Sequence, residues 1–193
     1  MKPEERLGRL LDELASSKPA PGGGSASAAV VAIAAALVEK VARLSGNSEA
    51  ERKANQLRTR SETLVEEDAQ AYLAYAQASH SVMIPAEVQA RIIEVPLQVA
   101  RMGLQVVELA HELGRTGKRS LRPDATTAAI LAHAAISAVA LLVQVNIGLD
   151  FKDPRLREAL ELRRSASESV RGAGRSVMRP PGRHGGQART REA

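Results

Sequence analysis

The chain has no cysteine and no tryptophan, and aromatic residues make up only 2% of its 193 positions. Without cysteine it can form neither a disulfide framework nor a thiolate-based metal or catalytic site. Hydrophobic residues still reach 44%, and small aliphatic side chains at that frequency favour closely packed helices over a β-sandwich. The first segment after Met1 is charged rather than apolar, so we expect no secretory leader and a cytoplasmic location.

The net charge of +5 suggests nucleic-acid binding, but its distribution argues against that function. Residues 163–193 hold 8 of the 27 basic residues and 2 of the 22 acidic ones, so the remainder is nearly neutral. Because this end is rich in Arg, Gly and Ser and poor in large apolar residues, we predict a folded domain over 1–165 and a disordered basic tail over 166–193. Such a tail can bind RNA or an anionic surface, although a solvated chain end is more common.

Hydrophobic periodicity predicts six helices and no strand, at about residues 2–17, 25–44, 48–79, 85–115, 124–149 and 154–169. The second and fifth are Ala-rich and contain long uncharged stretches. Residues 125–149 could span a bilayer by length, but they carry several polar side chains, so we do not expect membrane insertion. We predict an all-α fold, a compact bundle of about six helices around two buried Ala-rich central helices.

A run of three glycines precedes the second helix, in "KPAPGGGSASAA" at residues 18–29. Glycine permits close approach to the backbone, and the free N–H groups of a helix N-terminus attract a carboxylate or phosphate. Alternatively, Ser25 is an ordinary N-cap and the glycines only form the turn. The segment lacks the lysine of a P-loop, and taken alone it fits the turn better than a ligand site.

An acidic stretch, "LVEEDAQAYLAYAQ" at residues 64–77, contains a second candidate. Leu64, Asp68, Tyr72 and Tyr75 share one stripe of a helix, which would carry a carboxylate towards the bundle interior. Half-buried, this carboxylate would have a raised pKa and could exchange protons near neutral pH. The alternative, that all three acids lie on a solvated outer face, is the interpretation that spacing alone favours.

Pro96 lies inside the predicted fourth helix, within "EVPLQVAR". A proline there removes a helix hydrogen bond and leaves the carbonyl of Ile92 free, and the resulting kink can re-aim Glu94 and Arg101. Such a kink can equally serve only to wrap the helix around its neighbours.

Polar residues flank the fifth helix. Asp124 is placed to cap its beginning. Gln144 and Asn146 lie near its end, where a buried amide needs a protein partner or a polar ligand. The four histidines show no ligand spacing, so we expect no metal site.

In combination and in this order, five segments resemble the cyclodeaminase domain of formiminotransferase-cyclodeaminases and the related stand-alone methenyltetrahydrofolate cyclohydrolases. They are "PAPGGGSASA", "EEDAQAY", "EVPLQVA", "RPDATTAA" and "QVNIGLDFKD", and the resemblance covers about residues 4–165. It implies an all-α bundle that assembles at least as a homodimer. It also implies a tetrahydrofolate substrate that carries a one-carbon unit, no metal or redox cofactor, and a separate formiminotransferase as a further candidate partner.

Two reactions are compatible with the resemblance. One converts 5-formiminotetrahydrofolate into 5,10-methenyltetrahydrofolate and ammonia, and the other hydrolyses 5,10-methenyltetrahydrofolate to 10-formyltetrahydrofolate. The alternative function is a non-catalytic helical module for dimerisation or folate binding, because a fold can persist without its chemistry.

The resemblance also implies roles for individual residues. Asp68 matches the catalytic aspartate, and a single carboxyl group could act in turn as base and acid. The substrate-binding positions would be Gly22, Gly23, Gly24, Ser25, Tyr72, Glu94, Asp124 and Asn146. Two positions depart from the family pattern: Tyr72 replaces the usual Phe, and Pro123 replaces the small polar residue before Asp124.

Overall fold

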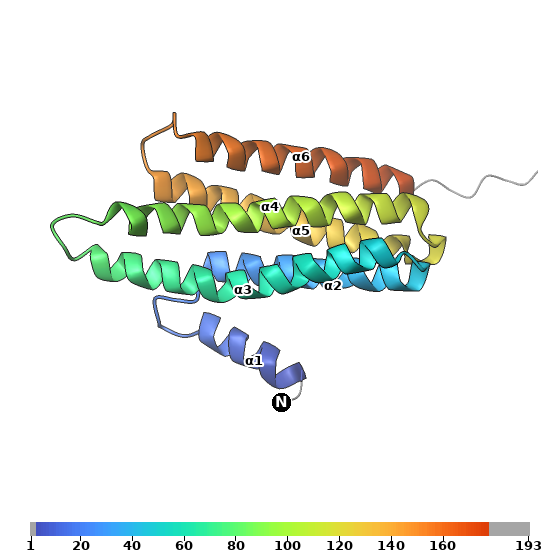
Figure 1. The fold of residues 1–193 in the computed structure, drawn as a ribbon, viewed down its shortest axis with the longest axis horizontal. Coiled ribbons are helices and arrows are strands. Elements are labelled where there is room, and N and C mark those ends of the chain that lie inside the picture. Colours follow the sequence, from blue (N-terminus) through green and yellow to red (C-terminus); the bar gives the residue numbers. More distant parts are fainter. Residues whose placement is uncertain (1–2, 178–193) are drawn as a thin grey trace, which may run out of the picture.

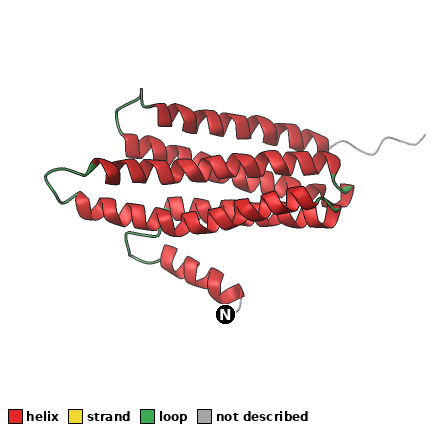
Figure 2. Cartoon of the chain, viewed as in Figure 1, coloured by secondary structure: helices red, strands yellow, loops and turns green. Residues whose placement is uncertain are grey.

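The structure, a computed structural model, describes residues 3–177, and these residues form helices and loops without a strand (Figure 2). The all-α prediction is therefore confirmed. Six α-helices and one short 3₁₀-helix follow one another: α1 (Pro3–Leu14), α2 (Gly23–Ser45), α3 (Ser48–Ala78), α4 (Ala86–Thr116), η1 (Arg119–Leu121), α5 (Arg122–Ile147) and α6 (Pro154–Val177).

Helices α2 to α5 run up and down as an antiparallel bundle because each connection between them is short (Figure 1). Helix α2 packs against α3 and α5, α4 packs against α5 and α3, and α6 covers α4 and α5. Helix α1 lies apart from this bundle (Figure 1). The N-terminus of α2, the C-terminal half of α3 and the C-terminus of α5 therefore meet at one end.

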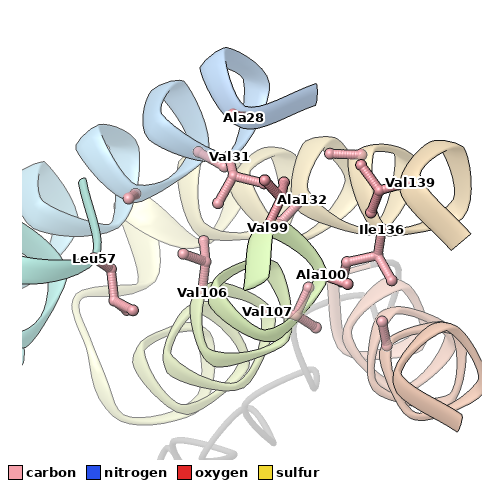
Figure 3. Close-up of a cluster of buried hydrophobic side chains, with 14 of the residues drawn as sticks. Ala28, Val31, Leu57, Val99, Ala100, Val106, Val107, Ala132, Ile136 and Val139 are labelled. Carbon is pink, nitrogen blue, oxygen red and sulfur yellow. The ribbon is translucent and has the colours of Figure 1, made fainter. Parts of the chain in front are cut away.

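The core is made of Ala, Val, Leu and Ile, as the composition predicts (Figure 3). Small residues bring the helices close together. A Cβ atom built on Gly103 of α4 would lie 2.7 Å from Cγ1 of Ile136 on α5, so glycine is needed where these two helices cross. Close packing of this kind compensates for the shortage of large side chains.

The expected burial of α2 and α5 on all sides is not confirmed. Each helix lines the core along one face. Each also exposes large apolar side chains, among them Ile33 on α2 and Leu141 and Val145 on α5. By length and composition, Gly23–Ser45 and Arg119–Ile147 could cross a membrane, but core helices of a bundle meet the same criteria, and 56% and 44% of the apolar 18-residue windows in these two stretches are buried here.

Helix α6 is longer than predicted. Residues 166–177, which we assigned to the tail, continue this helix, because Ala166 and Val170 extend its apolar stripe onto the core. The rest of the predicted tail, residues 178–193, lies outside the described part of the chain.

Candidate active site

A cavity of about 270 Å³ opens where the N-terminus of α2 faces α3, α4 and α5. Most of its lining is apolar, and its polar groups come from one carboxyl, one amide, one phenol and the backbone at the start of α2. The lining residues are Pro19, Gly22, Gly23, Gly24, Asp68, Ala71, Tyr72, Ile92, Pro96, Leu142 and Asn146.

The carboxyl group of Asp68 meets the first turn of α2. Its Oδ2 accepts a hydrogen bond of 2.9 Å from the hydroxyl of Ser25, and the backbone N–H of Ser25 also donates to this carboxyl. Removal from water raises the pKa of Asp68, and the two hydrogen bonds from Ser25 only partly oppose this effect. Among the described residues no cation forms an ion pair with Asp68.

The third glycine of the run makes room for this carboxyl group. A Cβ atom on Gly24 would lie 2.1 Å from Oδ1 of Asp68, which is far below van der Waals contact. By contrast, a Cβ atom on Gly22 would meet nothing within 4 Å, and one on Gly23 would meet only Leu142 at 3.9 Å. Gly24 therefore lets Asp68 approach the helix, whereas Gly22 and Gly23 leave open space at the pocket.

Ser25 is not the N-cap. Helix α2 begins at Gly23, two residues before the predicted start, and Gly22 is the N-cap without a side-chain hydrogen bond. Ser25 is therefore the third helical residue, completely buried, and its hydroxyl serves Asp68 instead of the helix end. The N–H groups of Gly23 and Gly24 have no hydrogen-bond acceptor within the described chain.

The opposite wall of the pocket is formed where α4 and α5 meet. Pro96 has no N–H to donate to the carbonyl of Ile92, and the side-chain amide of Asn146 donates to that carbonyl instead, at 2.7 Å. The side chain of Gln89 in turn donates to the backbone carbonyl of Asn146, at 2.9 Å. Asn146 is thus held by α4 at two points.

Two predicted substrate-binding residues lie elsewhere. Glu94 forms an ion pair with Arg101, which also binds Glu158 of α6, so the Glu94 carboxylate is already engaged outside the pocket. Asp124 pairs with Lys40 at 2.8 Å, at the far end of α5. At a rise of about 1.5 Å per residue, it stands roughly 33 Å along the helix from Asn146.

Two expectations about α5 are also corrected. Asp124 does not cap this helix, because η1 leads directly into α5 and the helix begins at Arg122, which leaves Asp124 in the first turn. Gln144 is exposed rather than buried. In the described part of the chain, no group of three His, Cys, Asp or Glu side chains could hold a metal ion.

The structure brings together Asp68, Ser25, the glycine run, Tyr72 and Asn146. Sequence reasoning did not name Ala71, Ile92 or Leu142 as pocket residues. Helical spacing could have indicated two of them, because Ala71 follows Asp68 by three positions and Leu142 precedes Asn146 by four.

These features define a class: an all-α protein with a single carboxyl group of raised pKa, presented to a helix N-terminus in a largely apolar pocket. Such a group is a stronger base than an ordinary carboxylate and can return the proton that it accepts. The model of the formiminotransferase-cyclodeaminase family matches residues 6–166, and the chain belongs to this family.

Two relatives extend this assignment. A protein from Methylorubrum extorquens named methenyltetrahydrofolate cyclohydrolase is 32% identical, and the match covers 82% of this chain and 88% of that protein. The crystal structure of formiminotetrahydrofolate cyclodeaminase from Thermotoga maritima has a TM-score of 0.75 at 22% identity and covers 92% of this chain and 93% of its own. At that identity the second match shows that the fold is shared.

Proposed function

We propose that this protein is a folate one-carbon enzyme that hydrolyses 5,10-methenyltetrahydrofolate to 10-formyltetrahydrofolate. The observation that carries the proposal is the carboxyl group of Asp68, which is half-buried, hydrogen-bonded by Ser25 and without a cationic partner in the described chain. The similarity to a cyclohydrolase over most of both chains supports this choice of reaction.

In this reaction Asp68 acts first as a base and then as an acid. Its carboxylate takes a proton from water as the water oxygen bonds to the methenyl carbon. The carbon–N5 bond then breaks as Asp68 returns the proton to N5, and the hydroxyl proton of the intermediate passes to solvent as the formyl carbonyl forms. Burial raises the pKa of Asp68, which makes its carboxylate a stronger base in the first step, and the same carboxyl group then returns the proton in the second. No metal or redox cofactor takes part in this scheme.

The N-terminus of α2 supplies hydrogen-bond donors for the ligand. The free N–H groups of Gly23 and Gly24 line the pocket at the positive end of the helix dipole, where a negatively charged or oxygen-bearing part of the folate can bind. The cavity is slightly smaller than the roughly 300–1,000 Å³ typical of ligand pockets, so it accommodates the reacting end of a folate and leaves the rest outside.

The second candidate reaction is the conversion of 5-formiminotetrahydrofolate to 5,10-methenyltetrahydrofolate. Here N10 attacks the carbon of the protonated formimino group, Asp68 takes the N10 proton and returns it to the departing NH₂ nitrogen, and ammonia leaves as the methenyl cation forms. The fold shared with a cyclodeaminase favours this candidate. A separate formiminotransferase would then supply the substrate.

Spectrophotometric assays separate the two reactions. The methenyl chromophore should disappear when the protein receives 5,10-methenyltetrahydrofolate, and the Asp68→Asn variant should lose this activity. Appearance of the chromophore from 5-formiminotetrahydrofolate alone would assign the cyclodeaminase reaction instead. If a folded protein turns over neither compound, the non-catalytic module replaces both proposals.

We also propose that the protein forms a homodimer. The outer faces of α2 and α5 expose Ile33, Leu44, Ile130, Leu141 and Val145, and the two helices pack side by side. Apolar residues at this density on neighbouring helices are typical of an interface. Light scattering should give twice the chain mass of 20.5 kDa, and Leu141→Glu should give the monomer mass. A wild-type protein that elutes as a monomer would contradict this proposal.

A further inference from the structure

One of the two polar atoms of the Asn146 side-chain amide is already hydrogen-bonded within the protein. The carbonyl oxygen of Ile92 can only accept a hydrogen bond, so the atom of the Asn146 side chain that faces it at 2.7 Å must be the NH₂ group. The orientation of this amide is therefore determined by its partner. Its Oδ1 is consequently directed away from Ile92.

This Oδ1 atom is available to a ligand. No hydrogen bond reaches it from the described residues, and it is not among the buried polar atoms that lack a partner, so it is accessible to solvent. Asn146 lines the same pocket as Asp68. The residues that line the pocket thus include Asn146, with a neutral acceptor oxygen accessible to solvent, as well as Asp68, whose carboxyl group performs the proposed chemistry.

The reason that the amide adopts this orientation lies on α4. In a regular helix the residue four positions after Ile92 would donate its N–H to the Ile92 carbonyl, but that residue is Pro96, which has none. Ile92 is a buried residue, and its carbonyl needs a donor. Asn146 supplies it, and Gln89 secures the backbone of Asn146 one helical turn away along α4.

We infer that Pro96 is a positioning residue: it withholds a helix hydrogen bond from the Ile92 carbonyl, which holds the Asn146 amide with its Oδ1 presented to the pocket as an acceptor for an N–H group of the bound ligand. The inference rests on the proposed function for the ligand's identity. A reduced pterin ring carries ring N–H and amino donors that fit such an acceptor. Pro96 thereby determines specificity without a hydrogen bond of its own.

Pro96→Ala tests the inference because it separates stability from binding. The new N–H at position 96 satisfies the Ile92 carbonyl, so the variant should unfold at a higher temperature than the wild type, since an internal proline is unfavourable in a helix. The Asn146 amide, released from its partner, should bind substrate less well, and the KM should rise about five- to tenfold with kcat nearly unchanged, as expected for one lost hydrogen bond.

Two further variants complete the experiment. Asn146→Ala should raise the KM by a similar factor but lower the melting temperature, because it leaves the Ile92 carbonyl without a donor. The double variant Pro96→Ala/Asn146→Ala should regain the stability while keeping the KM of Asn146→Ala. Gln89→Ala, a comparison variant, removes the bond to the Asn146 backbone and leaves the bond between the side-chain amide and Ile92, so its KM should rise less than that of Pro96→Ala.

A KM of Pro96→Ala equal to that of the wild type, or KM effects of the two substitutions that multiply in the double variant, would overturn the inference. The side-chain NH₂ protons of Asn146 give a readout that does not depend on turnover. They should exchange slowly with solvent in the wild type and quickly in Pro96→Ala, and equal exchange rates would also overturn it. A wild-type protein inactive on both folates would instead reject the proposed function, while the exchange rates would still test the positioning by Pro96.

Discussion

Two carboxyl groups lie in the interface between α2 and α3, and their surroundings shift their pKa values in opposite directions. Glu39 of α2 accepts hydrogen bonds from Arg58 of α3 and from Arg43, and the bond from Arg58 is the largest cause that lowers its pKa. Asp68 of α3 accepts hydrogen bonds from the hydroxyl and N–H of Ser25 on α2 and has no ion-pair partner within residues 3–177, and burial raises its pKa. A buried acid becomes a structural ion pair or a proton-exchanging group according to whether a guanidinium faces it.

The largest expected effect is on catalysis at Asp68. Asp68→Asn keeps the shape and can still accept from Ser25, but it can no longer take a proton. Turnover should fall by about 10²–10⁴-fold, the usual contribution of a positioned acid or base, with helical content unchanged. Circular dichroism and the methenyl assay measure the two quantities. A fully active Asp68→Asn variant would contradict the catalytic role.

The second prediction concerns Gly24. In Gly24→Ala the new Cβ atom collides with the carboxyl oxygens of Asp68, whose flexible side chain can move aside without unfolding the protein. Activity should fall by about 10²-fold, as expected for a displaced catalytic group, while the melting temperature stays close to that of the wild type.

Gly103→Ala is the matched control for Gly24→Ala. Its Cβ atom would come within 2.7 Å of the Ile136 side chain, in the core instead of at the site. This variant should lose stability by about 1–3 kcal/mol but keep its activity per folded molecule. If both glycine variants lose stability and activity in parallel, Gly24 has no special relation to Asp68.

At the other end of the interface, Glu39→Gln should affect stability rather than chemistry. The substitution keeps the volume and removes the charge that faces two arginines, both of them partly exposed. We expect a loss of about 1–2 kcal/mol in the free energy of unfolding, measured by urea denaturation, with unchanged kcat. A loss of turnover as large as that of Asp68→Asn would show that the two carboxyl groups are not separate in function.

Ser25→Ala should have a smaller effect and move the pH profile. The hydroxyl of Ser25 lowers the pKa of Asp68, so its removal should raise that pKa further. The acid limb of kcat/KM should shift to higher pH, and the rate at neutral pH should fall by about five- to tenfold, as expected for one lost hydrogen bond. If the acid limb did not shift, it would reflect the titration of a group other than Asp68.

The smallest effect is the pH dependence of stability, and here the two carboxyl groups should differ in sign. The pKa of Asp68 is raised, so its stabilising contribution is present below the unfolded value of about 3.9 and is lost as the pH rises through the folded pKa. The pKa of Glu39 is lowered, so its contribution is present above the unfolded value of about 4.3 and is lost as the pH falls.

Melting temperatures from pH 3 to pH 7 measure this difference. At pH 7 Asp68→Asn should be more stable than the wild type and Glu39→Gln less stable. Both differences should shrink towards pH 3. If at pH 7 both variants melted above the wild type, or both below it, the two carboxyl groups would not contribute to stability with opposite signs.

Much of the fold followed from patterns within single segments. The helices α2 to α5 begin and end within about two residues of the predicted positions, because turn residues and apolar periodicity are local signals. Helix α6 was predicted too short, since its last turns have a basic, Ser-rich sequence and their contact with the core, through Ala166 and Val170, was not apparent from the sequence.

The site was only partly predictable. The stripe that contains Leu64 and Asp68 allowed an inward-facing carboxyl group, although spacing alone favoured a solvated face, and Pro96 indicated a free carbonyl at Ile92. Neither pattern could say which donors would meet these groups, because Ser25 and Asn146 approach from other helices. Asp124 shows the same limit of sequence patterns. Its motif resembled a family site motif, but the residue lies at the far end of the bundle, where it pairs with Lys40.

The sequence by itself determined the helical class and the small-residue core, because these depend on composition and on spacing along one chain segment, and its resemblance to a known family singled out one acid, Asp68. The tertiary structure alone decided the chemical character of that acid. Whether a carboxyl group meets an arginine, as Glu39 does, or a hydroxyl and a helix end, as Asp68 does, depends on the register at which α2 and α3 pack. The pKa of a buried group responds to charges and donors a few ångströms away in space, wherever they lie in the sequence.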